Sequence, residues 1–293
     1  KNNNNNNKNT HTVNVYQMFC INQTFYTNVQ LQLKPQKYSI TFFLILQTHS
    51  ISNSTDCFSH GFTKRTGGIS SISTLSSLNL FSSSRRRDST AVVAENLRRL
   101  GLQAGFEPHQ FHLAKVNHAS DVWVMSKPAP ESYDGIVTNQ PGVVIAAPGA
   151  DCMPLLFTDP VAKVIGAAHA GWKGTLLGIA MATVNAMVLE FGSKLVNIVA
   201  VIGPSVGPCC FTMEPHSARE FQAIHPDCVR NMDSPRPYVD IRLATRQFLI
   251  LIVQFSKTSW MTASKCHNSS YELKYTKWKK RIGTLLCVTY KSF

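Results

Sequence analysis

Four short apolar runs, each bounded by proline, glycine or aspartate, constrain the fold of this chain more than any other feature of its sequence. They occupy residues 142–148 (GVVIAAP), 154–159 (PLLFTD), 162–169 (AKVIGAAH) and 197–204 (NIVAVIGP). Runs of this length, punctuated in this way, are typical of buried strands. The sequence therefore predicts a sheet in the interior of the molecule.

Segments with helical patterns alternate with these runs. Residues 83–102 begin with cap-type residues and continue with Val92, Val93, Leu97 and Leu100 on one face, which predicts an amphipathic helix that ends at Gly101. Residues 174–192 predict one long apolar helix closed by Gly192, and residues 111–125 are strand-like with a polar break at 117–121. The alternation indicates an α/β fold, or an α+β fold with a mixed sheet.

The positive charge of the chain is concentrated at its ends. The formal net charge is +13, but residues 56–248 carry 17 Lys and Arg against 15 Asp and Glu. A nearly neutral middle does not favour a nucleic-acid surface on the folded part. We therefore expect no nucleic-acid partner.

The flanks differ from the middle in composition as well as in charge. Residues 1–9 (KNNNNNNKN) are of low complexity, and the apolar stretch 40–47 is too short to span a bilayer. We expect a poorly ordered flank over 1–55, a folded domain over 56–248 and a divergent flank over 249–293, with no membrane span. Because no signal segment is apparent, we expect a cytoplasmic protein whose eight cysteines are reduced.

Three residues at predicted strand ends have the chemistry of metal ligands. His169 ends one buried run just before the turn AGWKG, Cys152 lies in the loop PGADCMP, and His118 lies at the polar break of 111–125. Two imidazoles and a thiolate would make a three-ligand zinc site with a fourth position open. Each residue also has a plain structural interpretation: a hydrogen-bonded core histidine, a small buried thiol and an exposed loop imidazole.

The motifs around these residues resemble a known family. PGADCMPLLFTDP, VIGAAHAGWKGT, VIGPSVGPCCF and KVNHASDVW, within residues 56–248, resemble the laccase-domain family of purine nucleoside phosphorylases. The resemblance implies a single-domain α/β sandwich with mixed sheets and flanking helices. It implies that His118, Cys152 and His169 form the metal-binding and catalytic trio, with zinc as the metal.

The resemblance also implies the substrates. They are adenosine, inosine, guanosine and methylthioadenosine, which phosphate splits into a base and a sugar 1-phosphate, and adenosine deamination is a further implied activity. An open zinc position can activate water and polarise a substrate oxygen. We therefore expect purine nucleosides and phosphate as the partners of this chain.

Three more residues are candidates for substrate or phosphate binding. Arg65 lies in TKRTGG, which resembles a sequence element of the family, and its guanidinium could bind two oxygens of phosphate at once. Asp134, before Gly135, could orient a ligand imidazole or act as an acid, or it could be a turn residue. Lys173 lies near a predicted helix start, where it could assist an anion. Cys209 and Cys210 are interpreted as packing residues, and no role is assigned to Asn79 or Asn96.

Two other functions remain open at this point. Two imidazoles and a thiolate also suit copper, and Met153 adjoins Cys152, so a copper-dependent polyphenol oxidoreductase is an alternative. Against it, the chain has no His-x-His pair. The family's C-terminal segment has no match after Phe248, so a catalytically silent purine-binding protein is the other alternative.

Overall fold

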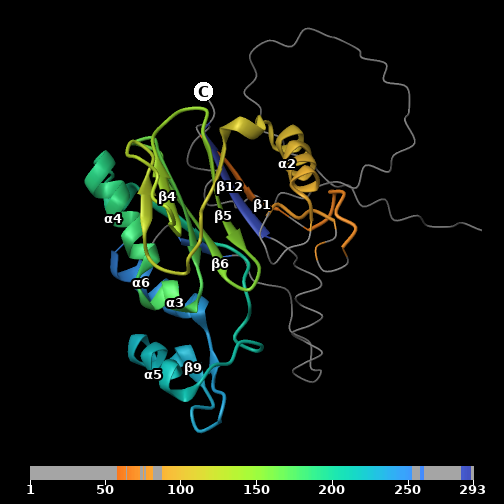
Figure 1. The fold of residues 1–293 in the computed structure, drawn as a ribbon. Coiled ribbons are helices and arrows are strands. Elements are labelled where there is room, and N and C mark those ends of the chain that lie inside the picture. Colours follow the sequence, from red (N-terminus) through yellow and green to blue (C-terminus); the bar gives the residue numbers. More distant parts are fainter. Residues whose placement is uncertain are drawn as a thin grey trace, which may run out of the picture. The chain divides into compact units, whose positions relative to one another are not determined.

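Two mixed sheets form the centre of the computed structural model, which describes residues 58–63, 65–72, 75, 77–81, 88–252, 258–260 and 285–291 (Figure 1). The larger sheet has the order β11-β8-β6-β7-β4-β3, and the smaller has the order β1-β12-β5-β2. The larger consists of β3 (Val122–Val124), β4 (Gly135–Thr138), β6 (Met153–Asp159), β7 (Val164–Ala170), β8 (Val199–Ile202) and β11 (Thr258–Trp260). The smaller consists of β1 (Phe58–Phe62), β2 (Phe111–Leu113), β5 (Val144–Gly149) and β12 (Leu285–Lys291).

Alternation along the buried strands sorts side chains into layers. On β6, Leu156 belongs to the apolar cluster between the two sheets, whereas its neighbour Phe157 belongs to the cluster under the helices. This follows from the two-residue period of a strand. Both faces of the larger sheet are therefore apolar, which explains why its strands read as continuous apolar runs.

Helices cover the outer faces of both sheets. α4 (Ile179–Phe191) and α6 (Ile241–Ile252) pack on the larger sheet, and α2 (Thr90–Ala104) packs through Leu100 on the outer face of β5. α5 (Pro215–Ile224), β9 (Val229–Arg230) and β10 (Tyr238–Val239) form a smaller cluster of their own with the start of α6. The predicted α/β sandwich with mixed sheets and flanking helices is confirmed.

The helix ends differ from those expected. α2 continues through Gly101 and ends at Gly105, whose φ of 79° suits glycine. Gly101 lies inside the helix, where the absence of a side chain lets the chain at Phe106 approach closely: a Cβ at Gly101 would lie 2.4 Å from the Phe106 carbonyl oxygen. The single helix expected over 174–192 is two helices, α3 (Trp172–Leu176) and α4, separated by Gly178 at φ 79°.

The C-terminal part of the chain contributes a helix end and two strands to the described structure. α6 continues to Ile252, β11 pairs in parallel with β8, and β12 lies between β1 and β5, antiparallel to both. β12 is thus an inner strand of the smaller sheet.

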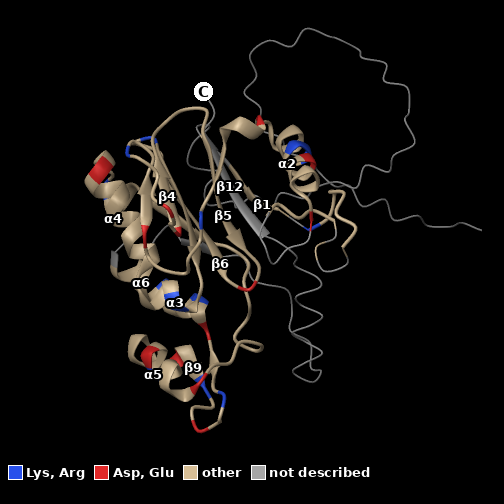
Figure 2. Cartoon of the chain, viewed as in Figure 1, with Lys and Arg blue, Asp and Glu red and all other residues tan. Residues whose placement is uncertain are grey.

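In the described part of the chain, basic and acidic residues lie on the same helices and loops. Figure 2 shows basic and acidic residues together on α2 and in the loop between β9 and β10. No helix among the described residues combines the length and apolar character that crossing a bilayer requires.

Candidate metal centre

His118, Cys152 and His169 lie together at one edge of the larger sheet. Cys152 immediately precedes β6 and His169 is near the end of β7, and the antiparallel pairing of Pro154 with His169 brings these two positions to the same edge. His118 reaches them from the loop between β2 and β3. One imidazole nitrogen from each histidine and the Cys152 Sγ all lie within 4.8 Å of one another.

This spacing is close to what a metal ion requires. Zinc bonds of about 2.0–2.3 Å in a tetrahedron would hold such donor atoms roughly 3.3–3.8 Å apart. Since the donor atoms lie within 4.8 Å of one another, they would have to close by at most about 1.5 Å on metal binding. A rotation of the His118 side chain, which is exposed, is a movement of that size.

The protonation of His169 suits a ligand. Its Nδ1 is 2.7 Å from the carbonyl oxygen of Pro148. Because a carbonyl oxygen can only accept a hydrogen bond, Nδ1 carries the ring proton and donates the hydrogen bond. Its Nε2 is buried and has no hydrogen-bond partner among the residues that the structure describes. A buried acceptor without a partner is costly, and a metal ion would satisfy it.

The pKa values of the trio follow from its burial. Burial, together with the charges of Asp151 and Asp134, raises the pKa of the Cys152 thiol to about 11. Burial lowers the pKa of His169, against the opposing effect of its bond to Pro148. Without a cation the centre therefore holds a thiol and a neutral imidazole, and the thiol must lose its proton to bind a metal.

Gly171 allows the three side chains to approach. A Cβ at this position would lie 3.0 Å from the Cys152 Sγ and 3.4 Å from the His118 Cδ2. Its backbone dihedrals, φ −77° and ψ 176°, are open to any residue. Space for the thiol and the imidazole, and not backbone freedom, is thus what glycine provides here.

Asp134 lies beside the trio, and among the described residues its carboxylate bonds to backbone N–H groups and not to an imidazole ring. It immediately precedes β4, is fully buried, and accepts hydrogen bonds from the backbone N–H groups of residues 117–119. We predicted that Asp134 could orient a ligand imidazole, act as an acid or serve as a turn residue before Gly135. In the structure its carboxylate binds the backbone of the loop that carries His118.

Arg65 and Lys173, the two basic candidates for phosphate binding, lie on different elements of the fold. Lys173 is exposed on α3, four residues after His169. Arg65 lies in the loop after β1, where its carbonyl oxygen accepts hydrogen bonds from the N–H groups of Ser77 and Leu78. Their contacts with phosphate remain predictions.

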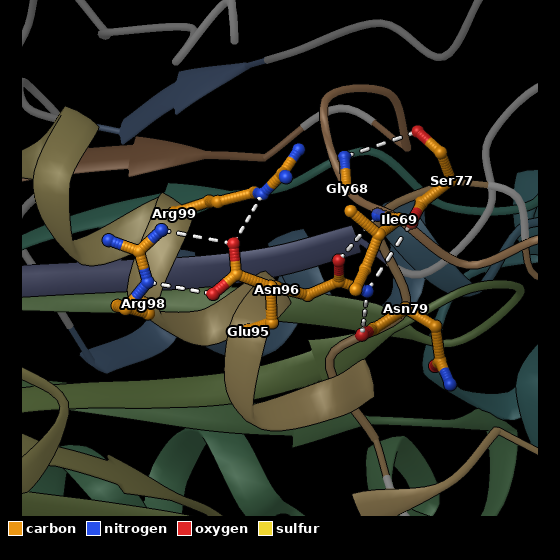
Figure 3. Close-up of polar contacts among 8 residues, drawn as sticks. All are labelled: Gly68, Ile69, Ser77, Asn79, Glu95, Asn96, Arg98 and Arg99. Carbon is orange, nitrogen blue, oxygen red and sulfur yellow. Dashed lines mark hydrogen bonds and ion pairs between the residues drawn. The ribbon is translucent and has the colours of Figure 1, made fainter. Parts of the chain in front are cut away.

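Asn96 holds the loop that carries Arg65, a role that the sequence did not indicate. From α2 its Oδ1 accepts a hydrogen bond from the Ile69 N–H at 2.7 Å, and its Nδ2 donates to the carbonyl oxygens of Asn79 and Ser77 (Figure 3). A Cβ on Gly68 would lie 2.4 Å from the Asn96 Oδ1, so the glycine permits this contact. A polar residue on the core side of an amphipathic helix was the available signal.

The remaining cysteines and Met153 have other surroundings. Cys152 and Cys228 carry free thiols, and the Sγ atoms of Cys209 and Cys210 lie 3.5 Å apart. Met153 is buried in the apolar cluster under the helices, with Leu155 and Ala170.

The chain is similar in sequence to a known protein family and to proteins of known name. Residues 59–271 match the family model described as multi-copper polyphenol oxidoreductase laccase. The purine nucleoside phosphorylase LACC1 of Mus musculus is 65% identical over 194 residues, which are 66% of this chain but only 45% of that protein. The chain thus spans less than half the length of that relative.

A more distantly related protein and a solved structure are also similar to this chain. Adenosine deaminase RL5, from an unknown prokaryotic organism, is 31% identical over 147 residues, covering 48% of this chain and 56% of that protein. The crystal structure of YlmD from Geobacillus stearothermophilus superposes with a TM-score of 0.71 at 24% identity, covering 89% of this chain and 98% of that one. At this identity the superposition shows a shared fold.

Proposed function

The chain belongs to the multi-copper polyphenol oxidoreductase laccase family, and from that premise we propose that it is a zinc-dependent purine nucleoside phosphorylase. The substrates would be inosine, adenosine, guanosine and methylthioadenosine. The observation that carries the proposal is the convergence of His118, Cys152 and His169 at one sheet edge. The 65% identity to a protein named as a purine nucleoside phosphorylase supports the choice of reaction.

The donor set favours zinc. Two imidazoles and one thiolate are ligands that zinc prefers, and three protein ligands leave a fourth position for substrate. Because Nδ1 of His169 carries the proton, the lone pair of its Nε2 is available to bind a cation, and Nε2 has no hydrogen-bond partner among the described residues. When bound, zinc would supply a Lewis acid that polarises an oxygen of phosphate, ribose or water.

In the proposed reaction phosphate displaces the purine. With inosine, the bond between C1′ of the ribose and N9 of the base breaks, and a phosphate oxygen bonds to C1′. The base leaves with the bonding electrons and takes up a proton, which gives hypoxanthine and ribose 1-phosphate. Lys173 and Arg65 are the basic residues that we assign to the phosphate, because cations offset its charge and a guanidinium can bind two of its oxygens.

Adenosine deamination is a second proposed activity. It is supported by the 31% identity to a protein named as an adenosine deaminase and by the same open-position chemistry acting on water instead of phosphate. This activity would release ammonia and inosine in the absence of phosphate. That difference separates it from phosphorolysis in one assay.

The name of the family model keeps copper-dependent phenol oxidation as the competing function. Multicopper chemistry requires several metal sites, but the described residues contain one group of three or more His, Cys, Asp and Glu side chains with converging donor atoms. A catalytically silent purine-binding protein is the other competitor. It would bind nucleosides without turning them over.

The decisive experiment measures hypoxanthine release from inosine by the full chain, with and without phosphate, together with the metal content of the same sample. We expect phosphate-dependent release, about one zinc per chain, and loss of release in Cys152→Ala and His169→Ala. The matched control is Cys228→Ala, which removes a buried free thiol outside the trio. Copper-dependent oxidation of a phenol by zinc-free protein, without nucleoside cleavage, would establish the laccase alternative instead.

A further inference from the structure

The loop that carries His118 is tied to the interior of the molecule by one buried carboxylate, that of Asp134. We propose that Asp134 is a positioning residue that holds His118 in its ligand geometry before a metal binds. The proposal rests on the metal centre proposed above. It assigns to Asp134 an action through the protein backbone, without contact with substrate.

Three hydrogen bonds from consecutive backbone groups carry the proposal. The N–H of His118 donates to the Asp134 Oδ1 at 3.1 Å, and those of Asn117 and Ala119 donate to Oδ2 at 3.2 and 3.0 Å. The carboxylate is fully buried, and both of its oxygens are engaged by these donors. A charged acceptor makes such bonds stronger than a neutral one would, so the anion is well matched to this task.

The backbone of His118 needs such an anchor. Its φ is 65°, in the left-handed region that non-glycine residues seldom adopt. Asn117 and His118 are both exposed, and the Asn117 side chain adds bonds to the Ser132 hydroxyl and the Ala119 N–H. Of the groups that hold this loop, the Asp134 carboxylate is the one that binds the His118 N–H itself.

Asp134 also joins this loop to the second histidine ligand. Its backbone carbonyl oxygen accepts a hydrogen bond from the His169 N–H at 2.8 Å. Its own N–H donates to the carbonyl oxygen of Asp121, at the far end of the same loop, at 2.9 Å. One residue thus sets the backbones of His118 and His169 relative to each other.

The test compares Asp134→Asn with Asp121→Asn in the full chain. Asparagine keeps the shape of the side chain, but its NH₂ group cannot accept a hydrogen bond from an N–H group. Asp121 is exposed in the same loop, so Asp121→Asn makes the same charge change without touching the anchor. The probe is Co²⁺, whose visible absorption reports thiolate ligation and ligand geometry.

We expect wild-type protein and Asp121→Asn to bind one Co²⁺ with the same affinity and spectrum. For Asp134→Asn we expect an affinity lower by about 10- to 100-fold, the usual effect of losing a group that orients a ligand, and an altered spectrum. If Asp134→Asn only lowers the melting temperature of the metal-free protein, with affinity and spectrum unchanged, the positioning role is overturned. If wild-type protein binds no Co²⁺, the proposed metal centre itself fails, and the positioning role fails with it.

A second measurement needs no variant and is independent of whether Asp134→Asn folds. In metal-free wild-type protein, the amides of residues 117–119 should be protected from hydrogen exchange because Asp134 already binds them. Rapid exchange of these amides without metal, followed by protection on adding Co²⁺, would show that the metal orders the loop and would overturn the proposal.

Discussion

Gly171 offers a steric probe of the metal centre, because a methyl group there would touch two of the three proposed ligands. In Gly171→Ala the new Cβ would lie 3.0 Å from the Cys152 Sγ, well inside the optimal distance of roughly 3.5–4 Å between non-bonded atoms. The backbone conformation at Gly171 suits alanine, so the cost arises from crowding alone. Overpacking of this kind costs about 1–3 kcal/mol.

The two ways in which the protein can respond have different consequences. If the Cys152 side chain moves away, the metal loses a well-placed thiolate, and a cost of about 1–3 kcal/mol corresponds to a metal affinity roughly 5- to 150-fold weaker. If the thiol stays in place, the melting temperature of the metal-free protein falls instead. Titration with Co²⁺ and thermal unfolding of the same sample measure both effects.

The Cys152→Ala background provides the control for this substitution. There the Sγ is absent, and the nearest remaining contact of the new methyl group is the His118 Cδ2 at 3.4 Å. Adding Gly171→Ala to Cys152→Ala should therefore change the melting temperature much less than adding it to the wild-type protein. Equal effects in both backgrounds, or no effect in either, would show that the thiol does not lie where the structure places it.

Two further predictions concern pH and the loop of Arg65. Because the pKa of Cys152 is raised to about 11, a metal ion must displace a proton from this thiol in order to bind. The affinity for Co²⁺ should therefore rise about tenfold per pH unit between pH 7 and 9, where His169, with its lowered pKa, is already neutral. An affinity that does not change with pH would show that Cys152 is not a ligand. Asn96→Ala should lower the free energy of unfolding by about 2–4 kcal/mol, because it removes the hydrogen bonds that Asn96 makes with the Ile69 N–H and the Asn79 carbonyl oxygen. If this loop presents Arg65, the same substitution should also raise the KM for phosphate. Denaturant unfolding beside Gln103→Ala, a half-buried residue on the same helix, measures the first effect, and a stability equal to that control would contradict it.

The strands of the larger sheet could be predicted from the sequence because both of their faces are buried. Each is a short apolar run with a breaker at its ends, and that pattern depends on few other parts of the chain. β6 and β7 match the runs at 154–159 and 162–169 within two residues at either end. The clustering of Cys152 and His169 follows from the same strands, since a connected antiparallel pair brings the start of one beside the end of the other.

Features set by contacts between distant segments could not be predicted in this way. Gly101 looks like a helix end until Phe106 is seen to pack on it, and Gly178 looks like an ordinary helix residue until the left-handed turn that separates α3 from α4 is seen. β12 lies in a basic and aromatic stretch without clear alternation, and it becomes a strand because β1 and β5 offer hydrogen-bonding edges on both sides. Local preference is weak for such a strand, and tertiary context decides.

The same distinction explains why the proposed ligands were easier to identify than their support. A ligand must be a histidine, cysteine or carboxylate, so the type of residue is itself a signal. The groups that support it are backbone N–H groups, which every residue but proline has, and the sequence does not show which three of them face Asp134. Asp134 could therefore be recognised as polar and close to a strand, but its role depends on the left-handed turn at His118, which only the folded backbone reveals.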